Sequence, residues 1–295
     1  GSALFHPDGG RMANYVAGER KGRGISNFSV GGNLGGAVGP MLAVFGISRF
    51  DLKGTAILAV PAFLMAAFLL SQTKTLAGFA NEGAQATKAA MAAGQKDDWK
   101  GFGKLTAVTF LRSTLSIGMT TFIPLFWMSV LLQSDARSGT TTTIIAFAGA
   151  LSTLIGGRLA DRLGFNRVIR SGLVMYIPCL LVINFSRWVG LSTIVLIPLA
   201  MSLNLAFSPS VALGQKLLPN HVGLASGITM GLASSFGGVI SPILGKVGDA
   251  QGLPTVLWIL VGVAVVACVG SFFVPDAPEA VKVPASSQAA SQKTN

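Results

Sequence analysis

Charged residues are scarce in this chain, and their scarcity argues against a water-soluble fold. Of the 295 residues, 11% are charged and 51% are hydrophobic, and the mean hydropathy is +0.63, whereas soluble domains carry about 25% charged residues. The formal net charge of +11 does not indicate nucleic-acid binding, because the basic residues lie in short clusters between apolar runs and not on one solvated face. We therefore expect an integral protein of the lipid bilayer that binds no nucleic acid.

Cysteine and histidine are also rare, with two of each. Cys179 and Cys268 lie deep in apolar runs and have no His or Cys at ligand spacing, which disfavours a disulfide framework and a metal site. A membrane-embedded enzyme would need a nucleophile, a base or metal ligands at one depth, and the apolar segments contain no paired carboxylates and no Cys-His pair. The sequence therefore predicts a protein that is not an enzyme and that needs no cofactor.

Eight apolar segments are long enough to cross a membrane as helices, for which about 20 residues are needed. They lie near residues 24–47, 54–71, 104–133, 139–160, 166–185, 189–209, 222–248 and 254–274. Residues 1–5 resemble the last turn of an earlier helix, and the chain opens without an initiator Met or a signal peptide. We expect an all-α membrane protein with about eight transmembrane helices plus the end of another, and an upstream part of the natural protein that is missing here.

The distribution of Lys and Arg predicts which helix ends face the cytoplasm, because basic loops are retained there during insertion. If residues 6–23 are cytoplasmic, sixteen Lys and Arg residues lie on that side, and five lie on the other, namely Arg49, Lys53, Arg137, Arg187 and Lys246. The remaining cation, Arg112, falls within a predicted span. This asymmetry places the linker and the C-terminus in the cytoplasm.

The order of the segments predicts four regions. Residues 1–71 form the remainder of an N-terminal half, and residues 104–275 form a C-terminal half of six helices. Residues 72–103 are rich in Ala, Gly, Gln and Lys and lack a long apolar core, so we interpret them as a cytoplasmic linker, compatible with an amphipathic helix on the membrane surface. Residues 276–295 have the composition of a disordered cytoplasmic tail.

A weak internal repeat relates the two halves. The string ALFHP at residues 3–7 aligns with LAFSP at 205–209, and GGAVGP at 35–40 aligns with GGVISP at 237–242, both at an offset of 202. Two matches at one offset favour a gene duplication. Parallel repeats of this kind build carriers whose substrate site lies between the halves near the middle of the bilayer.

One loop and the first 40 residues carry a resemblance to a known family. The string GGRLADRLGFNR at 156–167 is similar to the G-x-L-A-D-R-x-G-R-[RK] loop of the major facilitator superfamily, except that Phe165 and Asn166 replace basic residues. The stretch at 4–42, with its FHP and VGGN elements, resembles more narrowly the fosmidomycin resistance protein group of bacterial efflux carriers. The resemblance implies helices 4–12 of a twelve-helix bundle, with helices 1–3 and most of helix 4 upstream of Gly1.

The resemblance also implies a function. It predicts a monomeric secondary transporter of the bacterial cytoplasmic (inner) membrane that uses protons to export a small anionic antibiotic such as fosmidomycin. The coupling carboxylate of that family would lie in the missing helices. A different cargo (a sugar, a carboxylate or an amphipathic drug), uptake in place of export, and an inactive fragment remain as alternatives.

Arg112 is the strongest candidate for a substrate-binding residue, because an ionisable group at membrane depth usually faces a cavity. Thr109, Arg112, Ser116 and Thr120 share one helix face at this spacing, and a guanidinium can hold a phosphonate through two parallel hydrogen bonds. The alternative is an Arg that extends to lipid headgroups or forms a structural pair.

Two further polar groups fall in or near the predicted pathway. The resemblance places Asn204 and Ser208 on helix 10, which lines the central pathway in that family, although Asn and Ser commonly make hydrogen bonds between helices. His6 could carry protons, but the repeat aligns it with Ser208, which favours a structural role at a helix end.

The loop motif predicts a gate formed by Gly157, Arg158, Asp161, Arg162 and Gly164. The resemblance implies that the Asp161 carboxylate sits against the positive N-terminus of helix 5, near Gly22 to Ser26, when the cytoplasmic side is closed. The alternative is a solvated loop whose charges only set the topology.

Glycines at helical spacing form two faces of small residues. They include Gly31, Gly35 and Gly39 on one helix and Gly231 and Gly238 on another. Such faces let helices approach closely and slide, so we predict helix packing at these positions, with Asn33 as a polar group at the same interface.

Overall fold

The computed structural model describes residues 2–18, 20–92 and 94–276, and every regular element within them is helical. The structure therefore confirms the all-α class. The predicted tail lies, apart from Asp276, outside the described residues.

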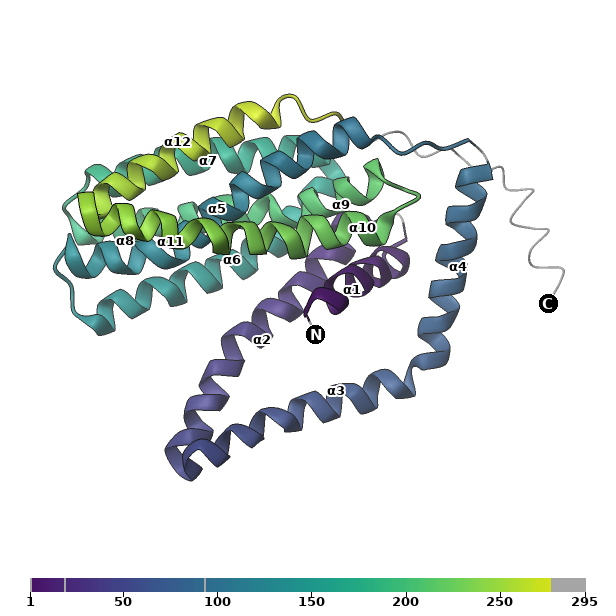
Figure 1. Cartoon of the computed structure of the whole chain (residues 1–295), viewed down its shortest axis with the longest axis horizontal. Helices are drawn as coiled ribbons and strands as arrows, with labels where there is room; N and C mark the ends of the chain where they lie inside the picture. Colours follow the sequence, from purple (N-terminus) through teal and green to yellow (C-terminus); the bar gives the residue numbers. More distant parts are fainter. Residues whose placement is uncertain (1, 19, 93, 277–295) are drawn as a thin grey trace.

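A bundle formed by the C-terminal half makes up most of the molecule (Figure 1). Its elements are α5 (Trp99–Ser129), α6 (Asp135–Leu163), α7 (Phe165–Phe185), α8 (Val189–Leu205), α9 (Phe207–Leu217), α10 (Val222–Ser226), the π-helix η2 (Gly227–Leu232), α11 (Ala233–Gln251) and α12 (Leu253–Ser271). Because α8 continues into α9, and α10 continues through η2 into α11, the bundle consists of six long rods within the described residues.

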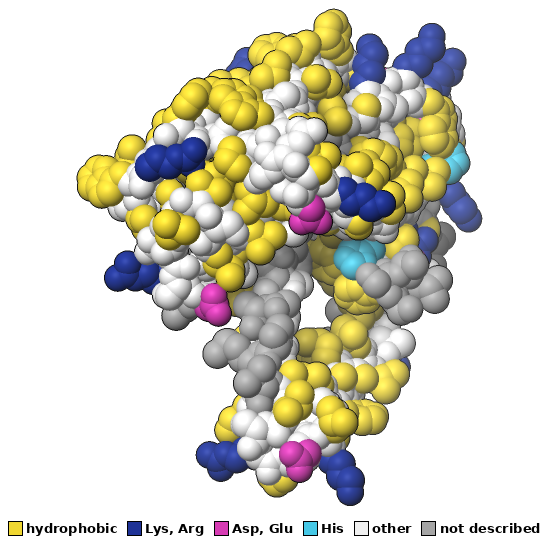
Figure 2. Space-filling view, turned by 60° about the vertical axis from the view of Figure 1, so that its left-hand side comes forward, with side chains coloured by type: hydrophobic (Ala, Val, Ile, Leu, Met, Phe, Trp, Pro, Cys, Tyr) yellow, Lys and Arg dark blue, Asp and Glu magenta, His cyan; other side chains and the backbone are white. Residues whose placement is uncertain are grey.

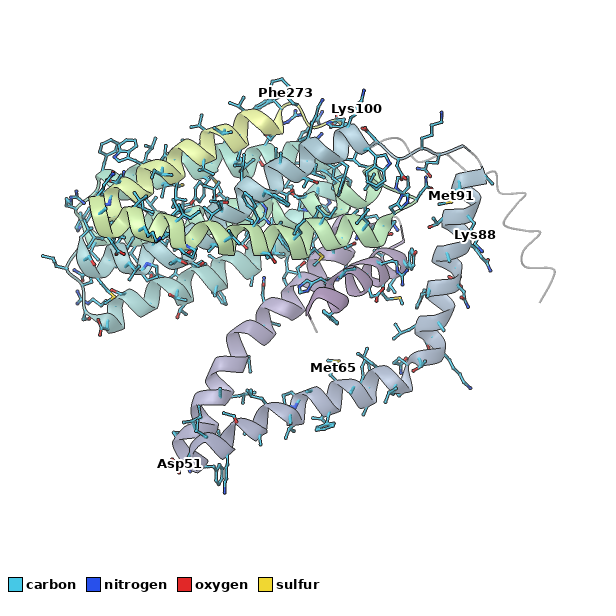
Figure 3. The ribbon with its side chains drawn as sticks, in the orientation of Figure 1. Asp51, Met65, Lys88, Met91, Lys100 and Phe273 are labelled. Carbon is cyan, nitrogen blue, oxygen red and sulfur yellow. The ribbon has the colours of Figure 1, made fainter. Side chains whose placement is uncertain are left out.

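The N-terminal part is more open (Figure 1). It consists of α1 (Ser2–Val16), α2 (Lys21–Phe50), the 3₁₀ helix η1 (Asp51–Leu58), α3 (Ala59–Ser71) and α4 (Thr73–Ala92). The first turns of α2 pack on α6 and α9, whereas α3 extends away from the bundle. Figure 3 shows Lys88 and Lys100 at the end of the molecule where α5 begins, and Asp51 at the distant end of α2.

Six helical stretches in the described residues are long and apolar enough to cross a membrane. They are Phe45–Ser71, Arg137–Leu163, Phe165–Phe185, Val189–Leu217, Val222–Gln251 and Leu253–Ser271. The 31 residues of α5 also suffice by length, but this helix is more polar because it contains Arg112 and several Ser and Thr residues. It lies inside the bundle, where Leu115, Ile123 and Phe126 are fully buried.

The segment Phe45–Ser71 leaves most of its apolar surface unburied. In the span Phe45–Ser71 only 6% of the apolar window is buried, and Met65, Phe63 and Leu70 are 56%, 75% and 74% exposed. Figure 2 shows hydrophobic side chains over much of the visible face, including the part formed by this segment. Exposed apolar surface on this scale is compatible with lipid or further helices and not with water.

The helix that follows α8 is longer than predicted. The sequence suggested a loop at 210–221, but α9 continues to Leu217. The rod is interrupted at Ala206, because Pro209 has no N–H to donate to the carbonyl of Leu205.

The predicted linker at 72–103 contains the helix α4. Its partly buried positions, including Leu76, Ala80 and Gly83, recur at helical spacing, and a Cβ at Gly83 would lie at the Tyr15 ring of α1. One face of α4 therefore packs on α1, as expected for an amphipathic helix.

The internal repeat corresponds to a spatial relationship between the halves. At an offset of 202 residues, α1 corresponds to α9, and α2 corresponds to α10, η2 and α11. In the structure α1 contacts α10 and η2, and α9 contacts α2. These reciprocal contacts are what a twofold relationship between duplicated halves requires, and they support the duplication.

Candidate functional site

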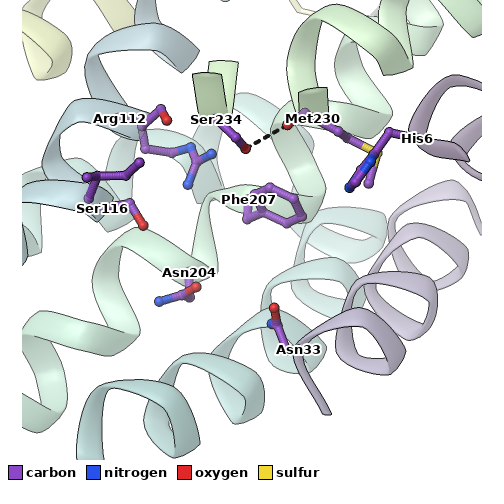
Figure 4. A pocket seen from close by; sticks show the side chains of 10 residues that line it. His6, Asn33, Arg112, Ser116, Asn204, Phe207, Met230 and Ser234 are labelled. Carbon is purple, nitrogen blue, oxygen red and sulfur yellow. Dashed lines mark hydrogen bonds between the residues drawn. The ribbon is translucent and has the colours of Figure 1, made fainter. Parts of the chain in front are cut away.

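A cavity of about 280 Å³ lies between the N-terminal helices and the bundle. Figure 4 shows that the residues lining it come from both parts of the molecule. They are His6 of α1, Asn33 of α2, Arg112, Ser113, Ser116 and Ile117 of α5, Asn204 of α8, Phe207 of α9, Met230 of η2 and Ser234 of α11. The cavity therefore occupies the interface where the repeat predicts a substrate site.

Arg112 is the only cationic Lys or Arg side chain that lines this cavity in the described part of the chain. The residue is 5% exposed, its Nε has no hydrogen-bond partner, and its Cζ lies 5.1 Å from the ring centroid of Phe207. A side chain that reaches lipid headgroups would be exposed, so the burial disfavours that interpretation.

Among the described residues, Arg112 has no acidic partner. The salt-bridge contacts in this part of the chain are Arg11 with Asp8 and, when the imidazole is protonated, His221 with Asp97. A buried guanidinium without a counter-ion is unfavourable, whereas the same group beside a cavity can be compensated by a bound anion.

Only one of the two Ser and Thr residues predicted to share the pathway with Arg112 reaches the cavity. Ser116 lines it, whereas Thr120 is exposed and its hydroxyl bonds within α5, at 3.1 Å from the carbonyl oxygens of Ser116 and Ile117. Of the residues expected on one helix face, Arg112 and Ser116 line the cavity, whereas Thr109 is buried outside it and Thr120 is exposed.

Asn204 and Ser208 are likewise separated. Asn204 lines the cavity, donates to the carbonyl of Ala200 at 2.9 Å and packs against Gly149. Ser208 is fully buried outside the cavity, and its hydroxyl has no hydrogen-bond partner. The interruption at Ala206 lies between them, so regular helical spacing does not apply, and Phe207 lines the cavity in place of Ser208.

Several lining residues were not predicted as part of the pathway. Met230 lies in the π-helix η2, and Ser234, in the next turn, donates to the carbonyl of Met230 at 2.7 Å (Figure 4). π-Helical turns are frequent at functional sites, but Gly227–Leu232 contains no sequence signal that separates it from an α-helix. His6 and Asn33 were recognised as polar groups, although not as cavity residues.

The gating loop contacts the first turn of α2. Asp161 Oδ1 accepts a hydrogen bond from the amide of Gly22 at 2.9 Å, and Oδ2 accepts one from the amide of Arg23 at 2.9 Å. These amides belong to the positively polarised N-terminus of a helix, where a carboxylate is favourable. The contact implied by the loop motif is thus present, while its role in gating stays a prediction.

The glycines of this loop have distinct geometric roles. A Cβ at Gly157 would collide with the carbonyl of Gly22 and the side chain of Ser26, so the absence of a side chain allows α6 and α2 to cross closely. Gly164 has φ +95° between α6 and α7, a conformation that favours glycine. The side chains of Arg158 and Arg162 are exposed.

Phe165 and Asn166, the two residues that differ from the loop motif, each contact another part of the chain. Lys216 Nζ lies 4.7 Å from the ring centroid of Phe165. Asn166 Nδ2 lies 2.7 Å from Pro275 O, 3.1 Å from Val274 O and 2.9 Å from Asp276 Oδ1. Asn166 therefore attaches the segment after α12 to the start of α7.

The glycine faces differ from expectation. A Cβ at Gly31, Gly35, Gly39, Gly231 or Gly238 would meet no atom within 4 Å, so these positions make no close helix contacts in this structure. Helical spacing defines a face of small residues but does not specify a covering helix, and α2 diverges from the bundle along this stretch (Figure 1). Close approach occurs instead at glycines such as Gly22 and Gly157.

Comparison with known proteins agrees with this architecture. The chain is 30% identical over 272 residues to the MFS-type transporter YfnC of Bacillus subtilis (strain 168), and 27% identical over 261 residues to the fosmidomycin resistance protein of Escherichia coli (strain K12). Each alignment covers 87% of this chain, but only 64% and 63% of the respective relative. The chain thus spans less than two thirds of the length of either protein.

Solved structures show the same fold. FucP in the outward conformation superposes with a TM-score of 0.68 at 12% identity, covering 92% of this chain and 72% of FucP. The proton:xylose symporter XylE gives a TM-score of 0.65 at 15% identity, covering 90% and 67%. The sequence model of the Major Facilitator Superfamily matches residues 1–242, and the chain therefore belongs to that superfamily.

Proposed function

We propose that this chain is the larger part of a secondary transporter that exports a small anionic compound, with a phosphonate such as fosmidomycin as the best-supported cargo and protons as the driving ion. The observation that carries the proposal is Arg112, which is buried beside a cavity between the halves and has no acidic partner in the described part of the chain.

The chemistry of the cavity fits a small anion. Its volume of about 280 Å³ is close to the lower end of small-molecule sites, which start near 300 Å³. The guanidinium supplies charge and paired donors, and Ser116, Ser234 and Asn204 supply neutral hydrogen-bonding groups beside it. Phe207 and Met230 offer an apolar wall for a short carbon chain.

Phosphonates and carboxylates present similar oxygens to an Arg, so the cavity alone does not choose between them. The similarity to a fosmidomycin resistance protein favours the phosphonate and supports export. Neutral sugars have less support, because they would leave the charge of Arg112 uncompensated.

The contact between Asp161 and the start of α2 suggests how the transporter opens and closes. We infer that this end of the molecule faces the cytoplasm of a bacterium, in agreement with the excess of Lys and Arg there, and that it is closed in this structure. The residues Gly157, Arg158, Asp161, Arg162 and Gly164 would then separate from α2 when the inward-facing state forms.

Drug tolerance tests the cargo. The gene that encodes this chain is expressed in bacteria that lack their own efflux pumps, and growth is measured with fosmidomycin, a carboxylate drug and a neutral drug. We expect raised tolerance to fosmidomycin from the wild type and from Arg137→Ala, an exposed control in the first turn of α6, and loss of tolerance from Arg112→Ala at equal expression. Equal tolerance from Arg112→Ala would overturn the anion site, and tolerance only to the neutral drug would overturn the cargo class.

If the expressed chain confers no tolerance, the binding of fosmidomycin is measured instead. Purified protein is titrated with fosmidomycin, because binding does not require a complete transport cycle. Binding that Arg112→Ala abolishes would identify a transport-inactive fragment with an intact site, whereas the absence of binding would contradict the proposed cargo.

A further inference from the structure

A buried polar network joins the two halves beside the Asp161 contact. Asn14 Nδ2 at the end of α1 donates to Gln215 Oε1 of α9 at 2.6 Å. Gln215 Nε2 in turn donates to the carbonyl of Gly10 at 3.0 Å and to Ser226 Oγ at 2.8 Å. Asn14 is 7% exposed and Gln215 is 2% exposed, so both amides depend on these partners when the halves are closed.

Lys21, the first residue of α2, is attached to this network. Its Nζ donates to the backbone carbonyl of Asn14 at 2.7 Å and to Asn14 Oδ1 at 2.9 Å. Neither acceptor is a carboxylate, and neither of the ion pairs in the described ranges involves Lys21. Both acceptors are uncharged oxygens, so no ion pair among the described residues holds the proton on Lys21.

The electrostatic surroundings also disfavour the charged form. Burial, and after it the positive charge of Lys216, lower the pKa of Lys21 to about 8. The charged residues at this end of the elements packed around Lys21 are Lys216 of α9, Arg158, Asp161 and Arg162 of α6, Arg11 and its partner Asp8 of α1, and Arg23 of α2 itself. The one carboxylate among the α6 groups already accepts hydrogen bonds from the amides of Gly22 and Arg23.

We propose that Lys21 is a pH-responsive proton-release site: in mildly alkaline medium it holds a proton while the cytoplasmic end is open and loses it when Lys21 closes onto Asn14. In this step an N–H bond of the ammonium breaks, the electron pair remains on Nζ, and the proton passes to cytoplasmic water. Closure and proton release are thereby linked. The proposal rests on the alternate opening of the two halves, but it does not depend on the cargo that Arg112 binds.

The link between closure and proton release fixes the direction in which the closed fraction changes with pH. In the open state Lys21 is hydrated and keeps the ordinary pKa of a Lys, near 10.4, whereas the closed state has the lower pKa of about 8. Below pH 8 both states are protonated, and the closed fraction does not depend on this group. As the pH rises from 8 towards 10, the closed state releases its proton first, so closure becomes more favourable.

Distance measurements between spin labels test the proposal in the absence of cargo. Labels are placed at Val16→Cys and Leu163→Cys, two exposed positions in different halves, after Cys179 and Cys268 have been changed to Ser. In reconstituted protein we expect the ratio of closed to open molecules to rise several-fold between pH 7 and pH 9. A ratio that stays constant over this range would overturn the proposal.

Three variants test whether Lys21, and not another titrating group, causes the dependence of closure on pH. Lys21→Met should remove the rise, and Lys88→Met, an exposed control on α4, should retain it. Asn14→Asp should also remove the rise below pH 9, because a carboxylate at this position keeps Lys21 charged. A rise that persists in Lys21→Met or in Asn14→Asp would contradict the assignment. Because no cargo is present, neither result affects the proposed role of Arg112.

Discussion

The Asp161 carboxylate and the backbone amide of Gly22 lie 2.9 Å apart, although 139 residues separate them in the chain. This contact connects α6 to the first turn of α2 and therefore joins the two halves of the molecule. Its geometry uses the partial positive charge of a helix N-terminus, and a close crossing at glycine makes it possible.

Asp161→Asn should weaken the closed state. The amide side chain has one acceptor oxygen and no charge, so we expect a loss of about 1 kcal/mol, which is typical of a carboxylate at an exposed helix N-terminus. The spin-label distance between positions 16 and 163 should shift towards the open population, roughly five-fold. Asp249→Asn, an exposed control, should leave the distribution unchanged, and an equal shift in both variants would contradict the role of Asp161.

Gly157→Val should prevent the close crossing of α6 and α2. The new side chain would collide with the carbonyl of Gly22 and with Ser26, and overpacking of this kind costs about 1–3 kcal/mol. The same distance measurement should report a lower closed fraction. Gly31→Ala is the matched control, since a Cβ there meets no atom within 4 Å, and a closed fraction that is unaffected by Gly157→Val would show that the crossing is not tight.

Arg112→Ala should reduce the affinity for a phosphonate by roughly 10- to 100-fold, the range expected when a charge-assisted hydrogen bond is lost. Arg112→Lys should recover part of the affinity, because the charge is kept while the paired donors are lost. Calorimetric titration of purified protein measures both effects. Thr120→Ala, which alters a residue outside the cavity, should bind as the wild type does, and a comparable loss in that variant would place the site elsewhere.

Asn166→Ala should release the segment after α12. This side chain contacts three oxygen atoms of residues 274–276, and the loss of its hydrogen bonds should cost about 1–3 kcal/mol of stability. Asn166→Ala should lower the midpoint of thermal unfolding in detergent, whereas Arg167→Ala, a change at an exposed neighbour, should leave the midpoint unchanged. An unchanged midpoint for Asn166→Ala would mean that the segment contributes nothing to the fold.

Hydropathy predicted the all-α class and most of the spans: six of the eight predicted segments coincide with stretches long and apolar enough to cross a membrane, whereas 24–47 and 104–133 correspond to the more polar helices α2 and α5. Apolar segments of membrane length correspond to the long rods, because their composition reflects the thickness of the bilayer. The offset of 202 residues indicated two duplicated halves, and the structure contains reciprocal contacts between α1 and α10 and between α9 and α2 that agree with this interpretation. The resemblance of the loop to the family motif likewise implied the partner of Asp161, a helix N-terminus in the other half, and the structure contains this contact.

Details that depend on local breaks in helices could not be predicted. Ser208 was expected beside Asn204, but the interruption at Ala206 brings Phe207 to the cavity instead. Gly31, Gly35 and Gly39 of α2 have helical spacing, yet a Cβ at any of them would meet no described atom within 4 Å. Periodicity identifies the face of a helix, whereas the neighbour of that face is decided by tertiary packing.

An experimentally determined structure with fosmidomycin bound is the most direct test of the anion site. The account predicts density for the ligand between the halves, with phosphonate oxygens at about 2.7–2.9 Å from the guanidinium nitrogens of Arg112. The account would be contradicted if fosmidomycin bound at a position that does not contact Arg112 while the guanidinium still faced a cavity filled by water or another molecule.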